Sequence, residues 1–363
     1  MACASIRHPL SLAALIALVA ALLLVPAAAG ASTPVTERTA TSAAAVRDYW
    51  SQARMRAAEP IEAPVTELPP EGDPLTRVPT TAGASYVPAG GADPRILAGS
   101  PSKASDAVRG ILPGSTREEI LDPAEPDFRS HGRVFFTIAT GAKAGDYVCS
   151  ATAVNSRNRS LVWTAGHCVF PEGGGEFAAN WVFVPAYHEG SAPFGEWPAK
   201  RLATTGPWEA AANIKYDLGA AVVRTSPTAG KLQNVIGARG IGFDQPREHT
   251  YQAYGYPAVQ PPLEFTGERE FRCTSPLGGN DEPGTTGPPT MSIGCDMTGG
   301  SSGGAWIAGT ILLSVTSYGY PLELNGLYGP YMSSSAKALY KGVRGKVQKP
   351  KPAGQKGPKS SKR

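Results

Sequence analysis

Short apolar runs dominate the chain from residue 133 onward. Segments rich in Val, Ile, Thr, Tyr, Phe and Trp alternate there with clusters of Gly, Pro, Asn and Asp. Runs of this kind, bounded by turn residues and lacking helical periodicity, predict an all-β sandwich or barrel. One short helix is expected over Ser334–Leu339. The expected strands are Arg133–Ala139, Tyr147–Val154, Ser160–Ala165, Trp181–Pro185, Leu218–Val223, Thr250–Tyr254, Glu270–Thr274, Thr290–Cys295, Gly304–Ile307 and Thr310–Ser317.

The composition agrees with many short elements joined by turns. Gly and Pro account for 42 and 34 of the 363 residues, about 21% against roughly 12% in an average soluble protein. Charged residues are only 18% of the chain, which argues against a coiled coil or a helical bundle. Hydrophobic residues reach 42%, so the chain has enough apolar surface to bury a core.

The N-terminal residues have the three parts of a secretory signal peptide. Arg7 supplies a positive charge, Leu10–Val25 is apolar, and Ala29-Gly30-Ala31 has the small-x-small pattern of a cleavage site. The apolar run covers about 16 residues, fewer than the roughly 20 that span a bilayer. We therefore expect residues 1–31 to be removed rather than retained as an anchor, and the mature protein to be secreted and extracellular.

Residues 32–130 differ from the strand-rich part. They are rich in Ala, Pro, Thr and Glu and contain no cysteine. One helix is expected over Ser42–Ala58, and the prolines from Pro60 to Pro79 exclude a regular element after it. Composition leaves open whether this largely irregular segment is a flexible linker or a pro-segment. The apolar residues at near-helical spacing are Val46, Tyr49, Trp50 and Met55.

The net charge of +4 is a property of the C-terminal end. Residues 341–363 hold nine Lys or Arg and no acidic residue, so residues 1–340 have a net charge of −5. The sequence pI of about 8.7 therefore gives no ground for a nucleic-acid-binding domain. We expect residues 342–363 to form a solvated, disordered basic tail, and a weak electrostatic contact of this tail with an anionic polymer is the second interpretation.

The cysteines point to disulfides. Of the five, Cys3 lies in the expected signal peptide, which leaves an even number in an oxidising compartment and three ways to pair them. A zinc site is the alternative, but the spacings of 19, 105 and 22 residues contain no C-x2-C pair. The four remaining residues are Cys149, Cys168, Cys273 and Cys295.

Ser302 lies in the glycine-rich segment Gly299-Gly300-Ser301-Ser302-Gly303-Gly304. A nucleophilic serine needs an accessible hydroxyl and backbone N–H groups that point at the oxyanion formed on attack. Glycines on both sides let the chain turn sharply enough for such N–H groups to converge. Taken alone, however, the segment is equally typical of a flexible turn.

His167 and Asp217 supply the other two groups that such a serine requires. His167 follows an apolar strand and precedes Cys168, and a disulfide at that cysteine would fix the ring of a general base. Asp217 leads into the apolar strand Leu218–Val223, where a buried carboxylate needs a partner and a catalytic imidazole is one. The alternatives are a structural histidine and a solvent-exposed aspartate at a strand edge.

These segments, in the order His, Asp, Ser, resemble the catalytic segments of the chymotrypsin-like (trypsin-fold) serine proteases. The similarity is greatest to the secreted bacterial branch related to glutamyl endopeptidases, and Val46–Ala58 resembles the pro-segment of actinobacterial members. The resemblance implies two packed six-stranded antiparallel β-barrels in a domain over residues 131–341, with the active site in the cleft between them. The segments are Thr164–Cys168, Asp217–Ala220 and Gly300–Gly304.

Carried over residue by residue, the resemblance assigns roles. Ser302 would be the nucleophile, His167 the general base and then acid, and Asp217 the carboxylate that orients it. The N–H groups of Gly300 and Ser302 would form the oxyanion hole. The pairing of Cys149 with Cys168 matches the family's histidine-loop disulfide and leaves Cys273 and Cys295 as the second bridge. The segment Ser317-Tyr318-Gly319 matches the strand that pairs with the substrate main chain.

The sequence departs from the family at Ser301, where most animal members have an Asp that pairs with a new N-terminal amine. Asp296 stands six residues before Ser302, where trypsin-like members bind Arg or Lys, although some Glu-cleaving bacterial relatives also have Asp there. Those relatives typically use a histidine on the strand before the Ser317 segment, and Thr310–Thr316 contains none. We therefore predict a basic or broad preference at the residue before the cut.

The sequence as a whole predicts a secreted serine endopeptidase that hydrolyses peptide bonds through an acyl-enzyme. We expect no cofactor and no metal, protein or peptide substrates, and a monomer. A catalytically inactive, protease-like binding protein is the alternative, and the three filled triad positions argue against it. An α/β-hydrolase esterase would have the order Ser, Asp, His and a G-x-S-x-G turn, which this chain lacks.

Overall fold

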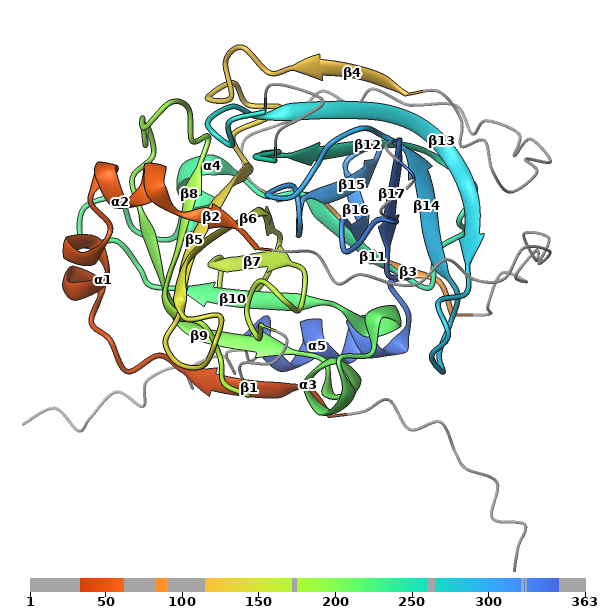
Figure 1. Cartoon of the computed structure of the whole chain (residues 1–363), viewed down its shortest axis with the longest axis horizontal. Helices are drawn as coiled ribbons and strands as arrows, with labels where there is room; N and C mark the ends of the chain where they lie inside the picture. Colours follow the sequence, from red (N-terminus) through yellow and green to blue (C-terminus); the bar gives the residue numbers. More distant parts are fainter. Residues whose placement is uncertain are drawn as a thin grey trace, which may run out of the picture. The chain divides into compact units, whose positions relative to one another are not determined.

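The computed structural model describes residues 33–61, 83–90, 115–171, 175–259, 265–320, 323 and 325–345 (Figure 1). All of them belong to the compact unit Ser32–Arg363. The predicted signal peptide and residues 346–363 of the predicted tail lie outside the described residues. Within the described ranges, no helix is both long enough and apolar enough to cross a membrane.

Six antiparallel strands close into a first barrel. Their order is β9-β10-β7-β6-β5-β8, and β8 pairs with β9 to complete the ring. Side chains along β5 alternate, because Val134 and Phe136 lie in the barrel core while Phe135 between them packs on the outer side. The strands are β5 (His131–Ile138), β6 (Gly145–Val154), β7 (Leu161–Thr164), β8 (Ala179–Pro185), β9 (Trp197–Thr204) and β10 (Gly219–Val223).

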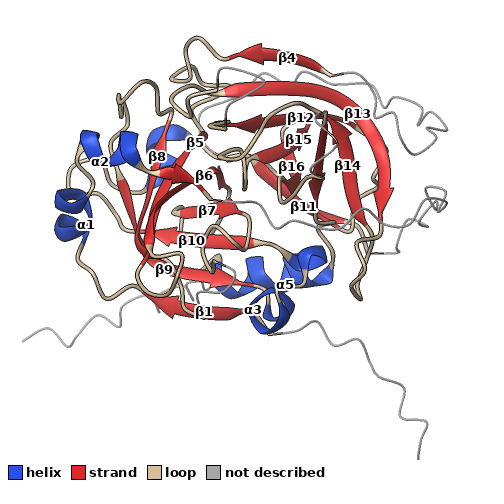
Figure 2. Cartoon of the chain, viewed as in Figure 1, coloured by secondary structure: helices blue, strands red, loops and turns tan. Residues whose placement is uncertain are grey.

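Six further strands form the second barrel in the order β17-β14-β13-β12-β15-β16. A single bridge between Tyr318 and Tyr328 joins its two ends. β11 (Gly240–Phe243) adds to β16 in parallel, which departs from the antiparallel pattern. Figure 2 shows the two groups of strands with short helices around them, so the predicted two-barrel all-β fold is confirmed. The strands are β12 (Thr250–Gly255), β13 (Phe271–Asp281), β14 (Thr290–Gly294), β15 (Ala305–Ala308), β16 (Ile311–Val315) and β17 (Gly326–Gly329).

The residues that precede the barrels are not largely irregular where the structure describes them. β1 (Val35–Arg38) pairs with β9, and β2 (Glu59–Pro60) pairs in parallel with β6. β3 (Ser85–Val87) pairs with β11, and β4 (Thr116–Glu119) pairs with β13. Each of these short strands uses the N–H and C=O groups at an exposed edge of a barrel strand, a contact that local sequence does not reveal.

The single helix predicted over Ser42–Ala58 is wrong, because the structure divides it into α1 (Ala43–Tyr49) and α2 (Gln52–Ala57). The hydroxyl of Ser51 accepts a hydrogen bond from the N–H of Arg54 at 3.3 Å and so caps a new helix. Trp50 ends the first helix, and its indole N–H donates to the carbonyl of Asn180 at 2.6 Å. Docking of Trp50 on the first barrel therefore overrides the continuous helical pattern.

From residue 131 onward, three strands lack a clean apolar run and have no counterpart among the predicted strands. β9 contains a proline and two cations, and β11 and β17 each hold two glycines in four residues. The predicted C-terminal helix is present as α5 (Ser334–Val343) and extends into the first residues of the predicted tail, where Val343 is 1% exposed. The remaining short helices are α3 (Gly206–Ala211), η1 (Ile214–Tyr216) and α4 (Leu232–Ile236).

Candidate active site

His167 lies in the turn that follows β7. Its N–H donates to Oδ1 of Asp217 at 2.8 Å, and its Nδ1 lies 2.8 Å from Oδ2 of the same carboxylate. Because a carboxylate oxygen accepts, Nδ1 carries the proton in this arrangement and Nε2 is left as an acceptor. His167 is 1% exposed, and Nε2 has no hydrogen-bond partner among the described residues. Asp217 thus holds the ring, while Nε2 forms no hydrogen bond with Ser302 in this structure.

Asp217 is fully buried directly after η1, so the alternative of a solvent-exposed aspartate is excluded. Its carboxylate accepts both hydrogen bonds from His167 and a third from the hydroxyl of Ser317 at 2.5 Å. Burial of a carboxylate costs several kcal/mol unless such donors surround it. The three donors therefore make a buried charge at this position tolerable.

Close packing around Asp217 explains a glycine in the histidine segment. A Cβ on Gly166 would lie 2.8 Å from Oδ1 of Asp217 and 2.8 Å from Cδ1 of Trp208. Only glycine lets the chain pass between these two groups and deliver His167 to the carboxylate.

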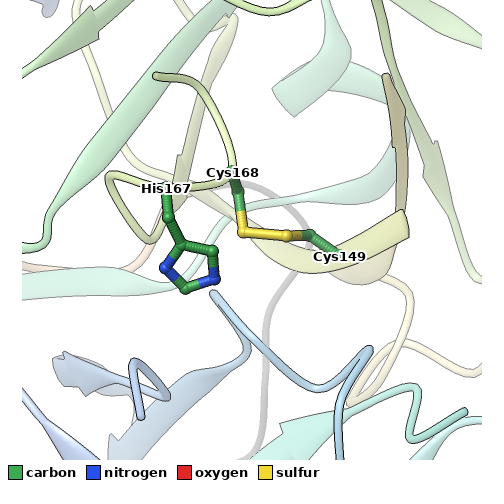
Figure 3. Close-up of side chains that lie close together, drawn as sticks. All are labelled: Cys149, His167 and Cys168. Atoms are coloured by element: carbon green, nitrogen blue, oxygen red, sulfur yellow. A yellow bond between two sulfur atoms is a disulfide. The ribbon is translucent and has the colours of Figure 1, made fainter. Parts of the chain in front are cut away.

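Both disulfides have the pairing that the resemblance implies. Cys149 is bonded to Cys168, and Cys273 is bonded to Cys295. Figure 3 shows the ring of His167 and the first disulfide leaving the same turn beside each other. The bridge ties this turn to β6, which is the role expected of a brace for the histidine loop.

The Ser302 loop lies against the histidine turn. The carbonyl of Ser302 accepts a hydrogen bond from the N–H of Ser150 at 2.7 Å and lies 3.7 Å from Sγ of Cys168. A disulfide sulfur has no proton, so the second approach is a van der Waals contact. Ser302 itself is 2% exposed. The structure therefore brings the three predicted triad segments together, although they are far apart in the sequence.

The N–H groups of Gly300 and Ser302 each point opposite to a carbonyl that is hydrogen-bonded within the protein. The carbonyl of the peptide bond before Gly300 accepts from the N–H of Ala258 at 2.7 Å, and the carbonyl before Ser302 accepts from the N–H of Gly304 at 2.9 Å. In a trans peptide the N–H points opposite to the C=O. No described residue accepts from either N–H, so two free donors remain for a ligand oxygen.

Metal ligands do not accumulate elsewhere in the described residues. Two clusters combine three potential ligands, and each contains both sulfurs of a disulfide, which cannot act as thiolates. Neither cluster is therefore a candidate metal site.

Solved structures of proteases match this chain. Protease Anisep from Arthrobacter nicotinovorans is 36% identical, with a TM-score of 0.55 over 63% of this chain and 99% of that chain. The thermostable serine protease AL20 from an extremophilic microorganism is 39% identical, with a TM-score of 0.54 over 61% of this chain and 99% of that chain. The chain belongs to the trypsin-fold serine protease family. No protein-family model and no curated protein matches the sequence.

In this protease, Ser301 replaces the aspartate of most animal members and is satisfied within its own loop. Its hydroxyl and its N–H both donate to the carbonyl of Thr298, at 2.6 and 3.1 Å. Ser301 is 1% exposed and needs no partner from a new N-terminus.

The predicted substrate strand presents its main chain but not the side chain of Tyr318. The N–H groups of Ser317 and Tyr318 donate to the carbonyl of Tyr328, and no described residue pairs with the N–H of Gly319. The Tyr318 side chain is 1% exposed, and its hydroxyl donates to Asp281 at 2.6 Å. Burial, helped by the neighbouring Asp281 charge, raises the pKa of Tyr318 well above 10.0. Tyr318 is therefore a core residue, and its own N–H and C=O both pair with Tyr328.

Asp296 has a partner that the sequence did not reveal. Nη1 of Arg117 in β4 lies 2.5 Å from Oδ2 of Asp296, and the two side chains are 31% and 30% exposed. The other oxygen, Oδ1, is buried and has no described hydrogen-bond partner. The two residues lie 179 positions apart in the chain, so no local pattern signals the pair. The carboxylate that the resemblance assigns to basic substrates is thus already neutralised.

Proposed function

We propose that this protein is a secreted serine endopeptidase in which Ser302 is the nucleophile, His167 the general base and acid, and Asp217 the orienting carboxylate. The observation that carries the proposal is the buried Asp217 carboxylate, which holds Nδ1 of His167 and leaves Nε2 unpaired beside the Ser302 loop. Family membership supports the reaction class. The test is cleavage of a quenched fluorescent peptide library by the processed, secreted protein. An inactive binding protein would cleave no member.

The reaction begins when Oγ of Ser302 attacks the substrate carbonyl carbon while Nε2 of His167 takes the hydroxyl proton. The carbonyl electrons move onto oxygen, and the N–H groups of Gly300 and Ser302 stabilise this oxyanion. His167 then gives its proton to the leaving amine as the C–N bond breaks and an ester forms on Ser302. Water repeats the sequence on the ester and releases the acid product.

The Ser317–Gly319 segment supplies the edge to which the substrate main chain would add as a further strand. One side of this segment already pairs with Tyr328, and the N–H of Gly319 has no described partner. Main-chain hydrogen bonds of this kind contribute affinity for a substrate whatever its side chains are. The pocket around Asp296 would then set the preference at the residue before the cut.

We expect broad rather than basic preference, because Arg117 neutralises Asp296. Arg117→Ala should raise kcat/KM for cleavage after Arg relative to cleavage after Ala by about tenfold, since the carboxylate then lacks a cation. Glu118→Ala is the matched control, because it removes the neighbouring ion pair of β4 with Arg272 and leaves Asp296 untouched. Fast cleavage after Arg by the unmodified protein would contradict the expectation, as would an unchanged ratio in Arg117→Ala.

We further propose that residues 33–61 act as a pro-segment docked on the first barrel. Pro60 and Ile61 lie beside the Ser302 loop, because a Cβ on Gly299 would be 3.5 Å from Cβ of Pro60 and 4.0 Å from the carbonyl of Ile61. His167 and Ser302 are 1% and 2% exposed in this form of the chain. Both observations support a segment that restricts access to the site until it is removed.

The packing of β4 and β5 restricts where the chain could be cut to remove the pro-segment. Arg129 and Arg133 are candidates from the sequence, but Arg133 lies within β5 and is 2% exposed. β4 pairs with β13, and the Ile120 side chain that follows β4 is 3% exposed. Loss of β4 would expose this surface, so we propose that processing occurs before residue 116. N-terminal sequencing of the secreted form tests this boundary and the removal of residues 1–31.

Trp50→Ala should release the docked segment. Trp50 is 2% exposed and packs on Phe135 with ring centroids 5.6 Å apart, so its truncation should weaken docking by about 3–5 kcal/mol. In a Ser302→Ala background, which prevents self-processing, a fluorescent substrate peptide should bind at least about tenfold tighter. Asp48→Ala, on the exposed face of α1, is the control. Equal affinity of both variants for the peptide would refute a blocking role.

The basic tail beyond residue 345 is assigned no catalytic part. We retain the proposal of a weak electrostatic contact with an anionic polymer, which the nine cations in residues 341–363 support. Deletion of the tail should abolish low-salt binding to such a polymer and leave peptide cleavage unchanged.

A further inference from the structure

Ser150 in β6 is hydrogen-bonded to three other segments: the Ser302 loop, the end of β7 and the residue that follows β12. It is 2% exposed, and all of its polar groups are paired. Its N–H donates to the carbonyl of Ser302 at 2.7 Å, and its hydroxyl donates to the carbonyl of Gly300 at 2.8 Å. The same hydroxyl accepts from the N–H of Tyr256 at 2.9 Å, and its carbonyl accepts from the hydroxyl of Thr164 at 2.8 Å.

The two carbonyls that Ser150 holds belong to Gly300 and Ser302, whose N–H groups form the proposed oxyanion hole. We propose that Ser150 is a positioning residue that fixes the orientation of these two peptide donors, an inference that rests on the proposed protease function. The Ser150 hydroxyl donates to the carbonyl of the Gly300–Ser301 peptide bond, and the Ser150 N–H donates to the carbonyl of the Ser302–Gly303 peptide bond. The Gly300–Ser301 peptide bond lies between the two peptide bonds that carry the donor N–H groups, so Ser150 restrains the donors through the peptide bonds next to them.

Gly300 is the part of the loop that most needs such a restraint. Its φ is +94°, and glycine changes peptide orientation at little cost because it has no Cβ. A Cβ here would lie 2.6 Å from the carbonyl of Tyr256, so no bulkier residue can stiffen the position. Among the described residues, the Ser150 hydroxyl is the one partner of the Gly300 carbonyl. Without it this buried carbonyl and the N–H of Tyr256 would both lose a partner.

The position of Ser150 also links the donors to the histidine segment. Thr164, whose hydroxyl donates to Ser150, ends β7 three residues before His167. A Cβ on Gly303 would lie 2.0 Å from Oγ1 of Thr164, so the Ser302 loop is pressed directly onto this pair. Ser150 and Thr164 together set the relative position of the oxyanion donors and the base. The Ser301 substitution fits this arrangement, because the loop is held from β6 rather than by an activation amine.

Ser150→Ala tests the proposal. The variant keeps the backbone bond to Ser302 and loses the hydroxyl that holds Gly300, so kcat for peptide hydrolysis should fall about 10- to 100-fold while KM stays within about twofold. Inhibition by a peptide aldehyde, whose hemiacetal oxygen uses the same donors, should weaken by the same factor as kcat. The pH dependence of kcat/KM should not move, because His167 keeps its partner. Ser150→Thr restores a hydroxyl and should recover most of the rate.

Ser314→Ala is the matched control. Ser314 is fully buried and its hydroxyl donates to the carbonyl of Pro330 at 2.8 Å, so the variant loses one buried hydrogen bond away from the loop. It should show a lower melting temperature with unchanged kcat and aldehyde affinity. Equal kcat in Ser150→Ala and the parent would overturn the proposal, as would a rate loss with unchanged aldehyde affinity or without recovery in Ser150→Thr. A parent protein that cleaves no peptide and binds no aldehyde would instead refute the proposed function.

Discussion

Ser302→Ala is expected to lower kcat for peptide hydrolysis about 10⁶-fold, as loss of a catalytic serine does in proteases. Alanine removes the oxygen that forms the acyl-enzyme, and the buried Nε2 of His167 then has no hydroxyl to deprotonate. The substitution removes a single oxygen, so the fold and substrate binding should persist. The measurement is kcat and KM on a quenched peptide, with a binding assay to show that the variant still takes up substrate.

The neighbouring Ser301 provides the discriminating control. Both serines are buried in the same loop, but the hydroxyl of Ser301 donates to the carbonyl of Thr298 at 2.6 Å. Ser301→Ala should therefore cost about 1 kcal/mol of stability and less than about tenfold in kcat. If Ser301→Ala and Ser302→Ala lose activity equally, or if Ser302→Ala stays active, the assignment of the nucleophile is wrong.

Asp217→Asn is expected to lower kcat about 10⁴-fold. Three donors surround the carboxylate, two from His167 and one from Ser317. An amide presents an NH2 group toward at least one of them, so His167 must lose its partner or shift its proton to Nε2. In either case Nε2 of His167 can no longer accept the proton of the Ser302 hydroxyl in the right geometry. The measurement is kcat near neutral pH together with the melting temperature.

Asp244→Asn is the control for this change. Asp244 is another aspartate between His167 and Ser302 in the sequence, and burial raises its pKa from 3.8. It lies outside the site, so its variant should keep kcat within about twofold. Full activity of Asp217→Asn in a protein that folds normally would exclude Asp217 as the orienting carboxylate.

Much of the fold and the arrangement of the candidate site was predictable because both are encoded in contiguous segments. The strand predicted over Ser160–Ala165 is present as β7 (Leu161–Thr164), and the histidine segment follows it. The glycines around Ser302 predicted a sharply turned loop, in which Gly300 and Gly303 do have positive φ. Local spacing was sufficient in these cases because each conformation depends on neighbours in sequence.

Contacts between distant segments were not predictable. Ser150 and Gly300 lie 150 positions apart, and to local pattern Ser150 is one small residue within a strand. Arg117 lies 179 positions from Asp296, in a segment whose composition predicted irregular structure. The pairing of β4 with β13, which brings Arg117 to Asp296, depends on a free strand edge that only the folded barrel provides.

Residues 33–61, which precede the barrels, likewise combine features that the local sequence predicts with contacts that it does not. Val46, Trp50 and Met55 are all buried, but they lie in two helices and the residue after the first helix rather than on the face of the single helix that their spacing predicted. The break at Ser51 and the docking site on Phe135 depend on the surface of the first barrel. The sequence pattern therefore predicts helical structure and buried apolar residues in this segment, but not the surface on which they pack.

The most direct test of the central claim is active-site labelling of the processed, secreted protein with a fluorophosphonate, followed by mapping of the modified peptide by mass spectrometry. The phosphonate reacts with a serine only where a base activates it and an oxyanion hole receives the phosphoryl oxygen. We predict one label per chain, on Ser302, and none in the folded His167→Ala variant. A processed and folded protein that takes no label, or that is labelled at another serine, would contradict the claim that His167, Asp217 and Ser302 form the catalytic centre.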